Sequence, residues 1–474
     1  MKRAAGILAC LLTALIARAG DREAARVYDS LRASPRLETF LRAFPKGGDL
    51  HNHLGGSITP EQWIAIAIRR GFCVDEKALA LIEVPEPGCP AGTAPAASLR
   101  KDGPVYQRYV EAASMRGNRG GPEKAHDHFF QAFGHIRVRT AATILGDELE
   151  AAVVHAHEQN LTYLELQILP LPGAMVGNIA TRLAPEAGFE TWLETVEKSA
   201  EFHDLIGVAQ RAMQRSEAEL QQRRPAEAAA IRWRYLLSTN RNAPPAVLFV
   251  QLAAVADLAR IEPRVGGLNL AGPEDGQVSL RDFNLQMRMI GFLRSKKPWL
   301  RVSLHAGELT PQILHAETGT VPEALTFHIG ESVRIAGAER IGHATDLRYE
   351  KDREALLRTM RDRHVLAEIC LTSESVIQSL KPEEIPFEAY RKAGVPVALN
   401  TDDEGILGSD LSHEFLRAAR DYKLSYRDLK DLARNSIKYS FLPAKPKAEA
   451  EARLEDQFRE FEAAASLGRF RSAK

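Results

Sequence analysis

The sequence predicts an α/β protein, a (β/α)8 TIM barrel with an insertion after strand 1 and extra helices. From Leu161 onward, short apolar runs alternate with longer amphipathic stretches, which is the pattern of strands that are each followed by a helix. Eight apolar runs can be counted along the chain, and eight parallel strands with intervening helices would close into a barrel. An open doubly wound sheet would carry a GxGxxG turn after its first strand, and that motif is absent.

Chemically unusual residues gather where the expected strands end. Five segments stand out there: GDLHNHLGGS, LNLAGPE, VSLHAGE, RIGHAT and ALNTDDEG. In a barrel of this kind the loops after the strands form the active site, so these segments should meet at one end. The expected strands are Gly48 to His53, Leu161 to Ile168, Ile231 to Ser238, Val265 to Ala271, Arg301 to His305, Arg340 to His343, His364 to Cys370 and Val395 to Thr401.

The first 19 residues have the composition of a signal peptide. Lys2 and Arg3 precede an apolar run from Ala4 to Ile16, and Ala17-Arg18-Ala19 has the small-x-small form of a cleavage site. The run is shorter than the roughly 18 apolar residues that a membrane span needs. We therefore expect cleavage near Ala19 and export of the mature chain, either to a periplasm or to the medium.

The rest of the chain divides into a helical segment (20–44), a barrel (45–442) and a C-terminal helical tail (443–474). Residues 71–119 form the expected insertion, in which PEPGCPAGTAPAAS is rich in Pro and Gly. The insertion could be a lid over the site, a surface for a partner, or a decoration of the barrel without a function of its own. Removal of the leader leaves Cys73, Cys89 and Cys370, and the first two form either a disulfide or two free thiols.

Charge excludes some partners. Lys plus Arg and Asp plus Glu both total 62, so no positive excess would draw the chain onto nucleic acid or an anionic membrane. A small-molecule partner fits this balance better. The sequence does not indicate an oligomeric state.

His51 and His53 are the first candidate metal ligands. One residue separates them at the end of an apolar strand, and the two-residue period of a strand sends both imidazoles to one face. An HxH pair alone also suits two packed, hydrogen-bonded histidines. His305 and Asp402 end two other expected strands, and three His and one Asp suit a single zinc ion per chain.

Three further residues have side chains suited to proton transfer. Glu308 lies three residues after His305, over the expected metal, where a proton donor is needed. His343 ends the sixth strand and could polarise or deprotonate a water, whose pKa zinc lowers to about 7. Asp403 could orient that water by a hydrogen bond. Taken singly, the acidic residues also suit a helix cap or a solvated turn.

In combination, PKGGDLHNHLGGSITPE, LAGPE, HAGE, IGHA and NTDD make the sequence resemble the adenosine deaminases of the amidohydrolase superfamily, from about Pro45 to Leu442. The resemblance implies zinc ligands at His51, His53, His305 and Asp402. It also implies a general acid at Glu308, a base at His343, a water-orienting carboxylate at Asp403 and a purine-reading backbone amide at Gly272.

The implied reaction is hydrolytic deamination of a purine nucleoside, adenosine or deoxyadenosine, to the inosine product and ammonia. Gly55 departs from the family, because nucleoside deaminases typically carry an acidic residue there that holds the ribose. Adenine, AMP or an N6-modified adenosine is therefore the alternative substrate. The leader and the insertion are similar to a secreted branch of the family, whereas HLGGS looks more like a shorter intracellular branch.

Two other classes of protein suit the barrel. A binuclear amidohydrolase would usually need a bridging lysine at the end of the fourth strand, and LNLAGPE has none. A non-catalytic extracellular binding protein would act through its insertion, but it would have no use for the proton donor Glu308.

Overall fold

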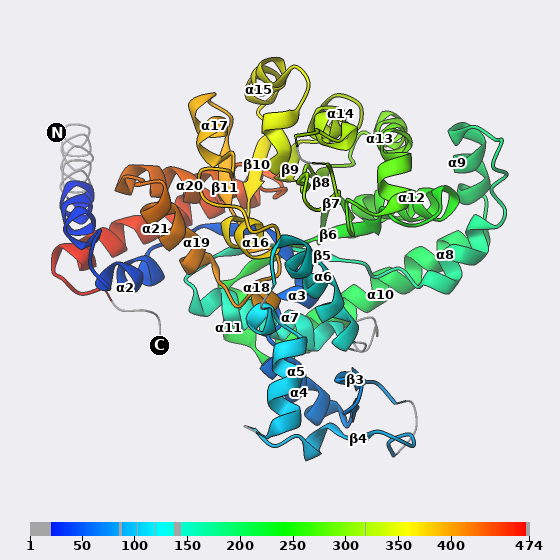
Figure 1. Cartoon of the computed structure of the whole chain (residues 1–474), viewed down its shortest axis with the longest axis horizontal. Helices are drawn as coiled ribbons and strands as arrows, with labels where there is room; N and C mark the ends of the chain where they lie inside the picture. Colours follow the sequence, from blue (N-terminus) through cyan, green and yellow to red (C-terminus); the bar gives the residue numbers. More distant parts are fainter. Residues whose placement is uncertain are drawn as a thin grey trace, which may run out of the picture.

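The computed structural model describes residues 20–84, 88–101, 103–118, 120–136, 144–317 and 319–470, and the expected leader lies outside these residues. Eight parallel strands form the centre of the molecule (Figure 1). They are β1 (Gly48–His53), β5 (Tyr163–Ile168), β6 (Arg232–Asn240), β7 (Val265–Ala271), β8 (Ser303–Ala306), β9 (Arg340–His343), β10 (Leu366–Ile369) and β11 (Val397–Leu399).

The strands form two four-stranded sheets that close on each other. One sheet has the order β1-β5-β6-β7 and the other β11-β10-β9-β8. A parallel bridge between Leu268 in β7 and Val302, just before β8, joins the two sheets on one side. A second parallel bridge joins them on the other side, between Asn52 in β1 and Asp402, three residues after β11. The predicted (β/α)8 barrel is therefore confirmed, and each of the eight expected strands overlaps an observed one.

Helices follow the strands and cover the barrel (Figure 1). Local sequence sets where several of them begin; for example, Ser425 and Asp428 form a reciprocal capping box at the start of α20 (Tyr426–Lys438). The helices after β5 are α8 (Gly173–Ala180), α9 (Phe189–Glu197), α10 (Ala200–Arg223) and α11 (Pro225–Ala230). The later ones are α12 (Pro245–Ile261), α13 (Gln277–Lys296), α14 (His328–Arg334), α15 (Arg353–Asp362), α16 (Leu371–Ile377), α17 (Phe387–Lys392), α18 (Glu404–Leu407), α19 (Leu411–Asp421) and α20 (Tyr426–Lys438).

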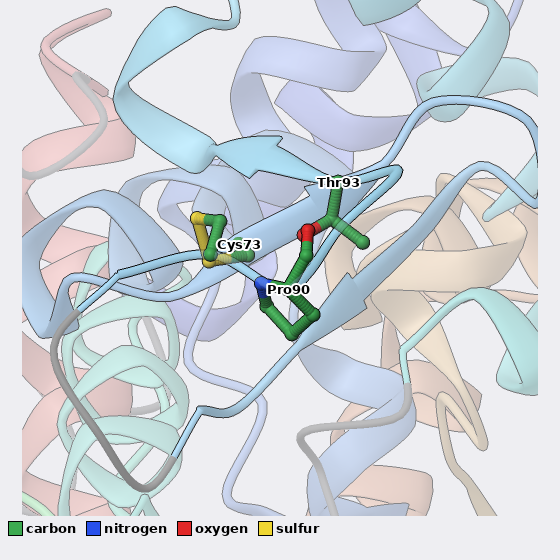
Figure 2. The surroundings of a disulfide bond; sticks show 4 residues. Cys73, Pro90 and Thr93 are labelled. Atoms are coloured by element: carbon green, nitrogen blue, oxygen red, sulfur yellow. A yellow bond between two sulfur atoms is a disulfide. The ribbon is translucent and has the colours of Figure 1, made fainter.

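The segment between β1 and β5 has its own small core. A three-stranded antiparallel sheet of β2 (Cys73–Asp75), β3 (Ala80–Ile82) and β4 (Ala94–Pro95) lies there in the order β3-β2-β4. Cys73 and Cys89 form a disulfide next to the turn in which the Thr93 hydroxyl donates to the Pro90 carbonyl (Figure 2). The helices of this segment are α3 (Leu54–Ser57), α4 (Pro60–Arg70), α5 (Pro104–Ala112), α6 (Pro122–Ala132) and α7 (Leu145–Glu158). The pairing of the two cysteines, which the sequence left open, is thus a disulfide.

The two ends of the described chain pack together. Residues 20–31 are helical, and α2 (Arg36–Ala43) and α21 (Ala444–Ser466) meet through Phe40 and Phe461, whose ring centroids are 4.9 Å apart. The Lys430 ammonium binds both Asp21 and Glu462. Within the described residues, the search for a helix apolar and long enough to span a bilayer finds none.

Candidate active site

Four ligand atoms from distant parts of the chain meet at one end of the barrel. His51 and His53 end β1, His305 lies in β8, and Asp402 follows β11. His305 Nε2 lies 3.0 Å from Nε2 of His51 and 3.0 Å from Nε2 of His53. Asp402 Oδ1 lies 3.5 Å from His51 Nε2 and 3.3 Å from His53 Nε2. The structure therefore brings the four expected metal ligands together.

Two of these separations match those around one tetrahedral ion, and the two of 3.0 Å are somewhat shorter. Ligand atoms that each lie about 2.0–2.2 Å from a tetrahedral zinc are roughly 3.3–3.6 Å from one another. His343 also reaches the cluster, since ligand atoms of His51, His305, His343 and Asp402 all lie within 4.8 Å of one another. A second group of this kind contains His53, Asp402 and Asp403. The cluster could hold a metal ion.

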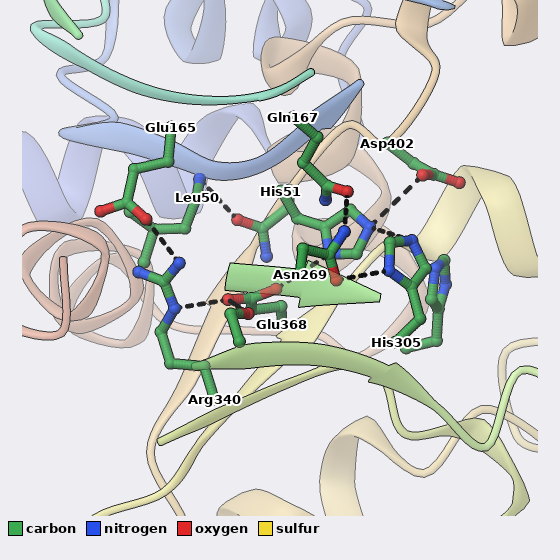
Figure 3. Close-up of polar contacts among 12 residues, drawn as sticks. Leu50, His51, Glu165, Gln167, Asn269, His305, Arg340, Glu368 and Asp402 are labelled. Atoms are coloured by element: carbon green, nitrogen blue, oxygen red, sulfur yellow. Dashed lines mark hydrogen bonds and ion pairs between the residues drawn. The ribbon is translucent and has the colours of Figure 1, made fainter. Parts of the chain in front are cut away.

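Neighbouring side chains orient the expected ligands (Figure 3). His51 Nδ1 lies 2.8 Å from Glu368, and His305 Nδ1 lies 3.0 Å from the Asn269 side-chain oxygen. Each acceptor favours the tautomer with the proton on Nδ1, which leaves a lone pair on Nε2 for a cation. The Ser373 hydroxyl donates to Asp402 Oδ2 at 2.7 Å, so that the other oxygen of this carboxylate faces the histidines.

The carboxylates beside the cluster favour a positive charge at His51, whereas burial and the other imidazoles disfavour one at His305. Burial opposes protonation of His51, but the carboxylates of Asp402 and Glu368 raise its pKa above the usual value. Burial and the neighbouring imidazoles lower the pKa of His305 well below its usual value, so that its ring is neutral at pH 7. Burial disfavours the ionised form of Asp402, but the His51 and His53 side chains lower its pKa well below the usual range. A metal cation bound by neutral imidazoles would satisfy the same carboxylates.

Arg340 continues this network into the barrel interior. Its buried guanidinium lies between Glu165 and Glu368, and the other oxygen of Glu368 faces His51 (Figure 3). The Ser303 hydroxyl donates to Glu368 at 2.8 Å. Burial raises the pKa of Glu368, but Arg340 and His51 outweigh it and lower that pKa below its usual value. Glu368 therefore stays an anion and a strong acceptor for His51.

Glu308 and His343 face each other beside the cluster. His343 Nε2 lies 3.7 Å from Glu308 Oε2, and His343 Nδ1 lies 2.9 Å from Glu374. Burial raises the pKa of Glu308 to about 7. Burial lowers the pKa of His343, but the carboxylates of Glu308 and Glu374 outweigh it and raise this pKa well above the usual value. The site thus contains a carboxyl that can donate a proton near neutral pH and a strongly basic imidazole.

Glycines allow close approach at two places. A Cβ on Gly56 would lie 1.5 Å from Asp403 Oδ1, so this carboxylate can occupy its position only because residue 56 has no side chain. Gly272, the expected purine-reading residue, has a φ of 104°, a conformation that other residues rarely adopt. It follows β7, at the same end of the barrel as the metal cluster.

Several functional residues of the site escaped the sequence analysis. Glu368 and Asn269 lie inside apolar strands, where a lone polar residue indicates a buried hydrogen-bond partner. Glu374 lies in α16 and is buried against His343. Sequence spacing does not show which histidine each of these residues reaches.

The fold and the donor set define the class of a metal-dependent hydrolase barrel. The sequence profile described as adenosine deaminase matches residues 149–457. The chain therefore belongs to the adenosine deaminase family, whose enzymes are of the amidohydrolase type. The matched part includes Gly272, His305, Glu308, His343 and the two aspartates after β11, whereas His51 and His53 precede it.

Curated relatives match part of the chain. The aminodeoxyfutalosine deaminase of Streptomyces coelicolor is 34% identical over 171 residues, which are 36% of this chain and 42% of that protein. The adenosine deaminase of Enterococcus faecalis is 35% identical over 127 residues, 25% of this chain and 37% of that protein. The chain thus spans less than half the length of these relatives. They do not bear out the expected likeness to a secreted branch.

Solved structures share the fold over most of the chain. The arabidopsis N6-mAMP deaminase has a TM-score of 0.58 at 19% identity and covers 88% of this chain and 99% of its own. The adenine deaminase of Arthrobacter aurescens has a TM-score of 0.55 at 18% identity and covers 89% of this chain and 100% of its own. At such identities the likeness shows the fold alone.

We expect Asn269→Ala to weaken zinc binding by about 10–100-fold, because His305 loses the acceptor that orients its ring. Competition with a chromogenic chelator measures the zinc affinity. Asn284→Ala is the matched control, since Asn284 is exposed on α13 and its side chain donates to Glu331. Equal zinc affinity in the two variants would contradict the orienting role of Asn269.

Proposed function

We propose that this chain is a zinc-dependent deaminase that hydrolyses adenosine or deoxyadenosine to inosine or deoxyinosine and ammonia. The observation that carries the proposal is the convergence of three imidazole nitrogens and one carboxylate oxygen beside Glu308 and His343. Membership of the adenosine deaminase family supports the same reaction type.

The identity of the substrate depends on finer features. The names of the relatives share the word deaminase but differ in substrate, from adenosine and aminodeoxyfutalosine to adenine and N6-mAMP. Gly55 offers no side chain to hold a ribose, which keeps adenine, AMP and N6-modified adenosines as alternatives. We place adenosine and deoxyadenosine first because the motif set as a whole resembles nucleoside deaminases.

Zinc would be held by His51, His53, His305 and Asp402, one ion per chain. When bound, it would supply the Lewis acidity that makes a water nucleophilic at neutral pH. The tautomers that Glu368 and Asn269 impose direct the imidazole lone pairs toward one point, so the residues fit this ion.

The side chains around the cluster would move the protons of the reaction. The Glu308 carboxyl donates a proton to purine N1, which makes C6 electrophilic. Beside a bound cation His343 would be a neutral imidazole; it accepts a proton from the attacking water, and the Glu374 carboxylate stabilises the resulting imidazolium. Asp403 accepts a hydrogen bond from that water. The C6–O bond forms, the His343 imidazolium returns its proton to the amino group, and the C6–N bond breaks as ammonia leaves. The remaining hydroxyl proton passes back to the Glu308 carboxylate as C6=O forms, so that water is the only co-reactant.

Glu308→Gln should lower kcat by at least about 10²-fold, since the amide has no acidic proton to donate. The assay follows ammonia release and ultraviolet absorbance with adenosine, deoxyadenosine, adenine, AMP and N6-methyl analogues. Glu323→Gln, at an exposed position, is the control and should retain activity. Zinc-loaded wild-type protein that turns over no 6-aminopurine would disprove the proposed function, and the best substrate of the panel decides among the alternatives.

The pH profile should report the proton donor. Since burial raises the pKa of Glu308 to about 7 and only the protonated form can donate, kcat/KM should fall as the pH rises through about 7. An ordinary exposed glutamate would already have lost its proton near pH 4–5. Measurement of kcat/KM from pH 5 to 9 tests this, and a rate that stays constant up to pH 9 would contradict the role of Glu308.

We also propose that the chain is exported after cleavage near Ala19, on the basis of its basic, apolar and small-residue N-terminal pattern. The disulfide between Cys73 and Cys89 is compatible with an oxidising compartment. Expression in a bacterial host followed by cell fractionation and N-terminal sequencing should give a chain that begins near Gly20 outside the cytoplasm. A cytoplasmic chain that retains Met1 would contradict export.

A further inference from the structure

A buried carboxylate holds the backbone of the loop that carries Glu308. The backbone N–H of Gly307 donates to Glu274 Oε1, and the backbone N–H of Glu308 donates to Glu274 Oε2, both at 3.0 Å. Glu274 follows β7, whereas the two amides follow β8. One side chain therefore ties the loop after one strand to the loop after the next.

Two further donors complete the surroundings of this carboxylate. His328 Nδ1 lies 2.5 Å from Glu274 Oε1, and Arg241 Nη1 lies 3.2 Å from Oε2. A carboxylate offers about four lone-pair sites, so the three hydrogen bonds from Gly307, Glu308 and His328 use most of them, and the Arg241 guanidinium adds an ion pair. Burial alone would raise the pKa of Glu274, but Arg241 and His328 lower it well below the usual range. Glu274 is thus an anion, and several contacts hold its carboxylate in one position.

The partners of Glu274 are themselves held firmly. Arg241 is fully buried, and its guanidinium donates to the His305 carbonyl at 2.6 Å and to the Leu270 carbonyl at 3.3 Å. The ring of His328 stacks on Phe283 with 3.6 Å between centroids and 2° between planes. The group of Arg241, Glu274 and His328, which we call the loop clamp, therefore bonds both the expected ligand residue His305 and the backbone of Glu308.

The loop has little freedom to relax without the clamp. Gly307 has a φ of 78°, and a Cβ there would lie 2.4 Å from Asp346 Oδ1, so the backbone makes a tight bend against a buried side chain. Glu308 is the next residue, and the direction of its side chain follows from that bend. A misplacement of about 1 Å in a catalytic group can cost about 10²-fold in rate.

We propose that Glu274 is a positioning residue, which through the loop clamp fixes the peptide between Gly307 and Glu308 and so presents the Glu308 carboxyl to the substrate. Glu274 itself does not touch the substrate. The inference rests on the proposed function, because it assumes that Glu308 donates the proton.

The decisive variant is Glu274→Gln, which replaces one acceptor oxygen by an NH2 donor that opposes a backbone N–H or a partner donor. We expect kcat to fall about 10²-fold while KM changes less than about 3-fold, because the substrate still binds beside a misdirected acid. The alkaline limb of the pH profile should also move to lower pH, because the negative charge of Glu274 raises the pKa of Glu308. The other charged groups that act on Glu308 are His343, Asp402, Glu374 and His126.

Glu274→Asp distinguishes the effect of the negative charge from the effect of the side-chain length. It keeps the anion but is shorter by one methylene, so it cannot bond both amides. We expect the alkaline limb to stay near its wild-type position while kcat still falls. Glu350→Gln is the matched control, since Glu350 is also buried and also accepts a backbone N–H at 2.8 Å, but from Gly330 in α14 and not from the loop that carries Glu308.

Hydrogen exchange tests the loop clamp without any turnover. In the peptide that spans residues 303–312, the amides of Gly307 and Glu308 should exchange at least about 10-fold faster in Glu274→Gln than in wild type, because they lose an acceptor. The same peptide should be unchanged in Glu350→Gln, and a peptide from α20 should be unchanged in both variants.

The outcomes separate the hypotheses. Unchanged kcat and unchanged loop exchange in Glu274→Gln would overturn the positioning role. An equal loss of kcat in Glu350→Gln would also overturn it, since general destabilisation would then explain the effect. If Glu274→Gln does not fold, the same readouts on Glu274→Asp decide. A wild-type protein without deaminase activity would disprove the proposed function, whereas the exchange experiment would still confirm or disprove the clamp.

Discussion

The charge balance around Arg340 is the constraint on which the metal-binding end depends. Its buried guanidinium lies between the carboxyl groups of Glu165 and Glu368 in the barrel interior, and it keeps Glu368 ionised. Removal of one partner from such a buried pair typically costs about 3–5 kcal/mol, because the remaining charge is left uncompensated. Since Glu368 is one of the two carboxylates, Arg340 also decides whether His51 has an anionic acceptor behind it.

The same arrangement recurs on the opposite side of the site. Glu368 is a buried anion that pairs with Arg340 and bonds the ring of His51. Glu274 is likewise a buried anion that pairs with Arg241, and it bonds the backbone N–H of Glu308. In both cases the arginine is almost completely buried. The barrel therefore stabilises its reactive groups through charges on neighbouring strands, which a water-filled cleft could not do as effectively.

The sequence predicted the strands, and which polar side chains would lie together at their ends, because both have local signals. Apolar runs of a few residues mark buried parallel strands, and HNH at a strand end places two imidazoles on one face. The small sheet of the insertion has strands of only two or three residues within a Pro- and Gly-rich segment, so no periodicity could reveal it. The roles of Glu368, Asn269 and Glu274 depend on contacts between residues far apart in the chain, which spacing does not encode.

The closure of the barrel has a consequence for how a bound ion would act on the whole fold. Single bridges join the two four-stranded sheets, and one of them pairs Asn52 with Asp402. His51 and His53 belong to the first sheet, whereas His305 belongs to the second and Asp402 follows its last strand. A cation held by all four would cross-link the two halves of the ring at a seam that has few backbone hydrogen bonds. Because the ion would bind only the folded chain, its binding would raise the free energy of unfolding, and the metal would stabilise the fold as well as take part in the reaction.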